Sequence, residues 1–112
     1  MSSVKKYLKS AKAALESNDP LLALEHAGDA LEEDPNCYFA HVFQGKSYQL
    51  LRDIPKAIAA FQKATEIEPD NLLAWKGYFQ VVRTTDDYKL FFNVLTNVIR
   101  VQINQEQSIA ET

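Results

Sequence analysis

Apolar residues recur along this chain at intervals of three and four residues, the spacing of one face of an α-helix. Over 4–17, for example, these positions are Val4, Leu8, Ala11 and Leu15. No stretch shows the strict alternation that is typical of a strand. The pattern predicts an all-helical chain. The expected helices are about 4–17, 20–34, 37–51, 71–84 and 87–103, together with one that Asp53 caps and that ends before Pro69.

The breaks between the expected helices carry residues that start or stop a helix. Asp19 is a suitable N-cap with Pro20 in the turn that follows, and Asp53 with Pro55 repeats this arrangement. The other expected caps are Ser2 or Ser3 for the first helix and Thr85 or Asp86 for the last.

The chain repeats itself at a fixed interval. The separation between Pro35 and Pro69 is the same as that between Ala30 and Ala64. A fixed period indicates a stacked array of identical units, and this one equals the tetratricopeptide period of about 34 residues. The expected array spans 1–103, with repeats at about 4–35, 36–69 and 70–103, followed by a polar tail at 104–112 that frays.

The middle repeat carries the residues that pair its two helices. Gly45 and Tyr48 lie one turn apart, and Ala57, Phe61 and Ala64 form one stripe on the next helix. Small residues let two helices approach closely, and Phe61 fills the space beside them. On these residues the chain resembles the tetratricopeptide repeat family. The resemblance implies a right-handed α-solenoid of three helix-turn-helix repeats that binds other proteins.

The second helix of the third repeat departs from the small-residue pattern. It is apolar on several faces, and a helix of that kind is expected to be covered. A further repeat, a second chain with self-association of the fragment, or a tail that folds back would each cover it. The residues of this expected stacking face are Phe91, Phe92, Val94, Leu95 and Val98.

Composition and charge narrow the class of protein. The 112 residues are 46% hydrophobic and 24% charged, which is typical of one globular domain. A net charge of −3 disfavours a general nucleic-acid domain. Cys37 is the only cysteine, which excludes internal disulfides and fits a reducing compartment. Neither a secretory signal nor an apolar run of membrane-spanning length is found.

Basic residues gather on the first helix of each repeat, which in tetratricopeptide arrays lines a concave groove. Residues 1–17 carry a net charge of +3 and 18–35 one of −6. The expected ligand is an acidic segment with apolar anchors. The alternatives are an ordinary solvated surface and, less favoured, single-stranded RNA. The groove candidates are Lys5, Lys9, Lys12, Phe39, Phe43, Lys46, Leu73, Lys76, Gln80 and Arg83.

The sequence offers no constellation for catalysis, cofactor binding or a metal. Cys37 and His41 lie one helical turn apart and supply two ligands at most, whereas a structural zinc site needs four. His41 stands one repeat period before Trp75, so we expect it to pack between helices as Trp75 does. The chain is therefore expected to act by binding rather than by chemistry.

Three segments show a narrower resemblance. Residues 8–15, 38–46 and 68–77 are similar to the amino-terminal repeats of superkiller-complex scaffold subunits. The resemblance implies a cytoplasmic scaffold that holds helicase and beta-propeller subunits and works with exosome-linked factors in 3′-to-5′ mRNA decay. Such scaffold subunits have no catalytic residue, so the resemblance implies none here. It also implies that the chain is an amino-terminal segment of a much longer protein.

Overall fold

The computed structural model describes residues 3–111, with side chains described for 3–109. It confirms an all-α solenoid, and no strand occurs in the described range. The helices are α1 (Val4–Glu16), α2 (Pro20–Glu33), α3 (Tyr38–Leu50), α4 (Ile54–Ile67), α5 (Leu72–Val82) and α6 (Tyr88–Glu111).

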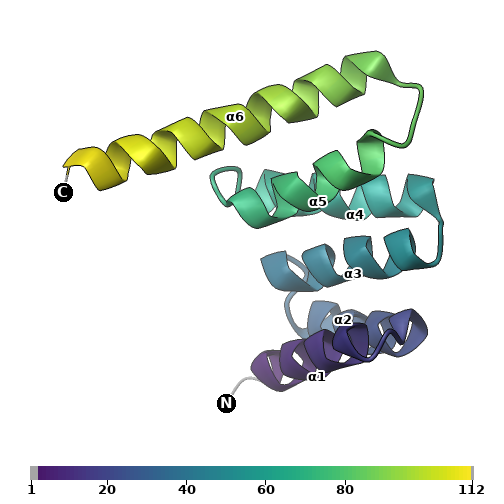
Figure 1. The fold of residues 1–112 in the computed structure, drawn as a ribbon. Helices are drawn as coiled ribbons and strands as arrows, with labels where there is room; N and C mark the ends of the chain where they lie inside the picture. The colour runs from purple at the N-terminus through teal and green to yellow at the C-terminus, as the bar shows by residue number, and fades with distance from the viewer. Residues whose placement is uncertain (1–2, 112) are drawn as a thin grey trace.

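The helices stack in three consecutive pairs. Each helix contacts the next along the chain, and α3 also contacts both α1 and α5. In Figure 1 the array therefore rises from α1 and α2 to α6, with α1 and α6 at opposite ends. The first helices of the three pairs share one layer, and this layer carries the groove described below.

Phe61 on α4 forms the centre of the array. Its ring is fully buried between two glycines, Gly45 on α3 and Gly77 on α5. A Cβ atom on Gly45 would lie 2.7 Å from the Phe61 ring, and one on Gly77 would lie 2.5 Å from it. The expectation that small residues admit Phe61 is confirmed, and the ring joins two repeats rather than one.

Two side chains at equivalent repeat positions close the turns before them. The indole Nε1 of Trp75 donates to the carbonyl oxygen of Pro69 at 2.8 Å. The His41 Nε2 lies 3.0 Å from the carbonyl oxygen of Pro35, which can only accept, so this nitrogen carries the proton. His41 thus makes the bond that Trp75 makes one repeat later, but its ring is only half-buried, so its expected packing between helices stays a prediction.

A third bond crosses between repeats. The backbone amide of Ala74 donates to the Tyr38 hydroxyl at 2.9 Å, joining α5 to α3. Burial raises the pKa of Tyr38 above its ordinary value of 10.0, so the phenol stays neutral at physiological pH. Burial raises the pKa of Tyr78 in the same direction.

The caps agree with the sequence in the middle of the chain and differ at its ends. The side chains of Asp19 and Asp53 accept from the amides of Leu22 and Lys56, as expected. Ser3 occupies the N-cap position of α1 without a side-chain bond, and Ser2 lies outside the described residues. The Asp87 carboxylate accepts from the Leu90 amide at 3.0 Å, so Asp87, rather than Thr85 or Asp86, caps α6.

Within the first two repeats, the turns share one unusual backbone position. Asn18 and Arg52 have φ angles of 58° and 62°, and they stand one repeat period apart. The next residues, Asp19 and Asp53, donate backbone hydrogen bonds to Ala14 and Tyr48, which closes each helix C-terminus. Left-handed geometry is common for asparagine and unfavourable for arginine.

The last helix is longer than the sequence predicts. Residues 104–111 continue α6, so they do not fold back over it, and their expected fraying stays a prediction. Arg100 fixes α6 to the α4–α5 turn: its guanidinium lies 3.0 Å from the Asp70 carboxylate and donates to the Pro69 carbonyl at 3.1 Å. In Figure 1 the C-terminal half of α6 extends beyond the other helices.

Candidate functional site

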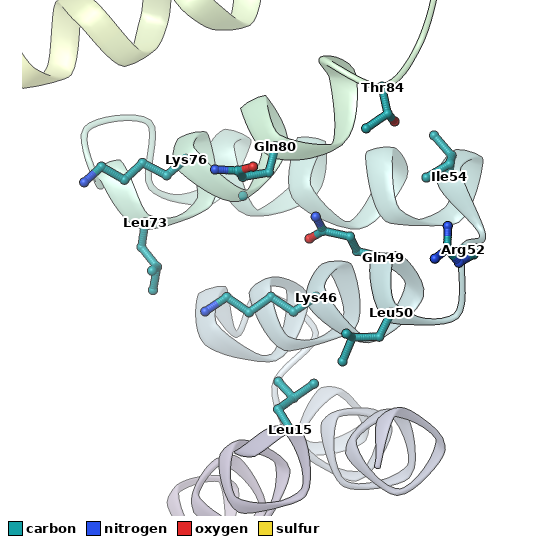
Figure 2. Close-up of a pocket in the computed structure, with 11 residues that line it drawn as sticks. Leu15, Lys46, Gln49, Leu50, Arg52, Ile54, Leu73, Lys76, Gln80 and Thr84 are labelled. Carbon is teal, nitrogen blue, oxygen red and sulfur yellow. The ribbon is translucent and has the colours of Figure 1, made fainter. Parts of the chain in front are cut away.

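The first helices of the repeats line a groove of about 900 Å³ (Figure 2). Lys46 from α3 and Lys76 from α5 reach toward the same end of it, beside Leu73. Gln49 from α3 and Gln80 from α5 lie nearer the middle of the view. Its lining residues are Leu15, Lys46, Gln49, Leu50, Arg52, Ile54, Leu73, Lys76, Gly77, Gln80 and Thr84.

A second pocket of about 440 Å³ adjoins the first toward α1. The two share Leu15, Lys46 and Leu73, so they form one continuous surface, called the groove from here on. The second pocket is lined by Lys12, Leu15, Glu16, Phe39, Phe43, Lys46 and Leu73.

The groove gathers most of the residues expected from the sequence, and leaves three outside. Lys5, Lys9 and Arg83 are exposed but line neither part of it. The groove reaches only the C-terminal half of α1, whereas Lys5 and Lys9 lie nearer its start. Those it brings together are Lys12, Phe39, Phe43, Lys46, Leu73, Lys76 and Gln80.

The two groove phenylalanines differ in how much they offer a ligand. Phe39 is 43% exposed, whereas Phe43 is 9% exposed and packs against the alanine cluster that includes Ala11 and Ala40. Their ring centroids lie 6.4 Å apart. Phe43 therefore packs beneath Phe39 as part of the core, and it presents no free ring face on which a base could stack.

Sequence reasoning missed the residues that the helix ends bring into the groove. Arg52 comes from the α3–α4 turn, Ile54 is the first residue of α4, and Thr84 comes from the turn after α5. Their placement depends on how the turn folds back. Leu15 was recoverable, because it lies one helical turn after Lys12 on the same face.

The groove carries an excess of positive charge. Four basic side chains line it (Lys12, Lys46, Arg52 and Lys76) against one acid, Glu16. None of the four forms an ion pair among the described residues, where only Lys56–Asp53 and Arg100–Asp70 do so. This arrangement suits recognition of a negatively charged segment, with apolar contact from Phe39 and Leu73.

The structure offers no comparable arrangement for metal chemistry. Across the described part of the chain, no three His, Cys, Asp or Glu side chains lie close enough to hold a metal ion. Cys37 is buried and unbridged, and His41 bonds to Pro35.

The expected stacking face on α6 needs correction. Val94 is completely buried, because it points toward α5 as part of the core, and it is unavailable to a partner. Phe91 and Val98 are half-buried against the same core. Phe92, at 61% exposed, keeps its expected place at the surface, and Leu95 is half-buried.

These features define a helical-hairpin solenoid with a basic, partly apolar groove on one layer. The family model for the tetratricopeptide repeat matches residues 38–71, so the middle helix pair of this chain is a tetratricopeptide repeat. Its sequence is 35% identical to Superkiller protein 3 of Saccharomyces cerevisiae, over 99% of this chain and 9% of the relative. It is 42% identical to Superkiller complex protein 3 of Homo sapiens, over 66% of this chain and 5% of the relative. The chain thus spans less than a tenth of these curated relatives.

Solved structures show the same fold at low identity. A MamA double mutant superposes with a TM-score of 0.86 at 20% identity, covering 93% of this chain and 58% of that one. The TPR2B domain of yeast Sti1, solved in complex with pHsp70, superposes with a TM-score of 0.85 at 17% identity. The match covers 97% of this chain and 89% of that one. The fold and the relatives support a protein-binding scaffold. Among the described helices, none combines the length and the apolar character needed to cross a bilayer.

Proposed function

We propose that the groove binds a segment of a partner protein that carries acidic side chains around an apolar anchor. The observation that carries this proposal is the set of basic groups that line the groove, none of which forms an ion pair among the described residues. Lys12, Lys46 and Lys76 lie on the side of Phe39 and Leu73, and Arg52 lies toward the other end. Acidic side chains would meet the ammonium and guanidinium groups, and an apolar side chain would rest against Phe39. This attraction would also raise the association rate, and added salt would weaken binding by screening the charges.

A direct test measures binding of a short fluorescein-labelled peptide in which glutamates flank one leucine and one phenylalanine. We expect Lys46→Glu and Lys76→Glu each to weaken binding about tenfold or more, since each replaces attraction by repulsion. Lys63→Glu is the matched control, because Lys63 is an exposed lysine on α4 outside the groove. Equal affinity for all four proteins, or no salt dependence, would exclude the groove as the binding site.

The same experiment separates protein from RNA as the ligand. RNA recognition would need ring faces for stacking, and Phe43 is buried. We expect a single-stranded oligonucleotide of comparable charge to bind less tightly than the peptide. A tighter, salt-sensitive complex with the oligonucleotide would reverse the assignment.

We also propose that the chain works as part of a superkiller-type scaffold in cytoplasmic 3′-to-5′ mRNA decay. The similarity to Superkiller protein 3 along 99% of the chain supports this role. In it, the full-length protein would hold helicase and beta-propeller subunits and exosome-linked factors rather than catalyse a step, and this chain would form part of that scaffold. Co-elution of the full-length protein with purified helicase and beta-propeller subunits tests the partners. Separate elution would refute this partner assignment and leave the peptide result unaffected.

A further inference from the structure

The groove has two positively charged ends and an uncharged middle. Lys46 and Lys76 reach toward one end, and Arg52 lies at the other (Figure 2). Gln49 from α3 and Gln80 from α5 lie between these ends in the view. An acidic segment that lies along the groove therefore meets positive charge at two separate places.

The middle of the groove offers side-chain amides that have no partner. Gln49 is half-buried and Gln80 is exposed, and neither side chain forms a hydrogen bond among the residues that the structure describes. Each amide can donate through its nitrogen and accept through its oxygen. An extended segment has free N–H and C=O groups to match both, whereas those inside a helix bond to one another. The middle of the groove thus favours a ligand in extended form.

The arginine at the far end has an unusual backbone conformation. Arg52 has a φ angle of 62°, and the first repeat places Asn18 at the equivalent position with a φ of 58°. Asparagine adopts this left-handed geometry readily, whereas arginine does so at a cost in free energy. The fold therefore keeps a guanidinium where a neutral side chain would be more stable. A guanidinium suits a carboxylate, because its planar fork can donate to both oxygens.

The acidic residues of the neighbouring turns lie outside the groove. Asp53 follows Arg52, but its carboxylate caps α4 and lies 3.7 Å from the Lys56 ammonium. Asp87, in the turn after α5, caps α6. None of the acids in these two turns, Asp86 included, lines the groove. Arg52 itself forms no ion pair among the described residues, so its charge is available to a ligand.

The length of α3 sets how far apart two carboxylates of a ligand would stand. From Lys46 to Arg52 the chain advances about 9 Å at the helical rise. An extended ligand advances about 3.3 Å per residue, so about three of its residues span this distance. A helical ligand would advance only about 4.5 Å over the same three residues. It would leave one end of the groove without its acid.

We propose that the groove binds its partner segment in extended form and contacts two acidic side chains about three residues apart. One acid pairs with Lys46 and Lys76, and the second pairs with Arg52. The peptide groups between them bond to Gln49 and Gln80. This inference rests on the proposed function, because it names the form and the spacing of the acidic segment that the groove would take.

Two peptides of opposite sequence order serve as probes. They are fluorescein-labelled Glu-Leu-Phe-Glu-Ser-Ser-Glu and Glu-Ser-Ser-Glu-Phe-Leu-Glu, which keep the leucine–phenylalanine anchor and add one glutamate beyond two serines. The two orders cover both directions in which an extended chain can lie along α3. Fluorescence anisotropy measures their affinity for the 112-residue chain, and the tighter of the two is the reference peptide below.

Arg52→Asn tests the second acid, because asparagine relieves the backbone strain while it removes the charge. We expect the dissociation constant to rise about fivefold or more, although the fold is not destabilised. Arg83→Asn removes the same charge outside the groove and should change the affinity little. Glutamine in place of the glutamate beyond the serines should weaken binding to the unchanged protein but not to Arg52→Asn. Equal losses for the two arginine variants would overturn the second contact.

Further changes to protein and peptide test the extended form. Gln49→Leu and Gln80→Leu should each weaken binding about threefold or more, since each removes hydrogen bonds to the peptide backbone. Gln62→Leu is the control, because Gln62 is exposed on α4 outside the groove. Two α-aminoisobutyrates in place of the serines impose a helical turn and should weaken binding about tenfold, whereas two valines should preserve it. Equal or tighter binding of the helical peptide would overturn the extended form.

The lysine variants separate this inference from the proposed function. If Lys46→Glu and Lys76→Glu weaken binding while the arginine and glutamine changes do not, the groove binds acidic peptides and the extended, two-ended contact is wrong. If neither peptide binds, or the lysine variants bind them as the unchanged protein does, the proposed function fails together with this inference. Far-ultraviolet circular dichroism checks that each variant keeps its helices.

Discussion

The second and third repeats follow the same spacing along the chain and yet pack their second helices by different means. Helix α4 buries Ala57, Ala60 and Ala64 against its partner helix. At the equivalent positions α6 carries Phe91, Val94 and Val98. Small side chains let α4 lie close to its neighbours, whereas the bulk on α6 fills space by itself. Repeat length thus sets where a helix occurs along the chain, and side-chain volume sets how it is packed.

Both the small side chains of α4 and the bulky ones of α6 can be packed, because the residues that face them on the first helix of each repeat differ in size. In repeat two, Gly45 faces the large Phe61. In repeat three, the residue equivalent to Gly45 is Phe79, whose ring lies 5.4 Å from that of Phe91. In repeat two a large side chain therefore packs against a glycine on the facing helix. In repeat three both facing residues are large, and their rings pack against each other.

The largest expected effect comes from emptying the centre of the second repeat. Phe61→Ala should lower the free energy of unfolding by about 3–5 kcal/mol, since the ring is fully buried and the flanking glycines cannot fill the cavity. Urea unfolding followed by circular dichroism measures this. Phe39→Ala, which truncates a 43% exposed ring, should cost less than about 1 kcal/mol. Comparable losses for the two variants would contradict the central role of Phe61.

A smaller effect is expected from giving repeat two a residue of repeat three. Ala64→Val places the residue found at Val98 on a fully buried position, where we expect overpacking to cost about 1–3 kcal/mol. Ala59→Val is the control, because Ala59 is exposed on the same helix. If Ala64→Val were as stable as the control, close approach would not be what the alanines provide. Thermal unfolding of both variants checks this.

The smallest effect concerns the turns. Arg52→Asn gives the second repeat the residue that the first uses at φ 58°, and should stabilise the fold by about 0.5–1 kcal/mol. Arg83→Asn is the control, since Arg83 has an ordinary φ of −65° and nothing to relieve. A shift in urea midpoint for Arg83→Asn equal to that for Arg52→Asn would show that lost charge, not backbone geometry, is responsible. Retention of a strained arginine that lines the groove is itself consistent with a binding role for Arg52.

Periodic features of the fold were predictable because each is recorded several times in the sequence. The helix pairs, the caps Asp19 and Asp53 and the place of Phe61 all follow from the repeat interval. The length of α6 was not predictable, because its polar C-terminal part has the composition of a disordered tail. Gln102–Ser108 contains no proline or glycine to stop the helix, and Arg100 fixes α6 to the α4–α5 turn.

The groove was predictable only where it is built from helix faces. Lys46 and Lys76 follow from helical spacing, because each lies on the first helix of its repeat. Arg52 and Thr84 reach the groove through turns, whose direction local sequence does not specify. The burial of Val94 was missed because a helix apolar on several faces gives no single phase for its core.

The bond between Trp75 and Pro69 gives the molecule an optical property. Trp75 is the only tryptophan, it is 8% exposed, and it stacks on Tyr78 with ring centroids 6.0 Å apart. Its indole is tied to the turn between α4 and α5, so its emission reports the junction of repeats two and three. In a solenoid each unit contacts only its neighbours. Fluorescence therefore follows the opening of one junction, while circular dichroism averages over every helix, and the chain carries its own local probe of how the stack comes apart.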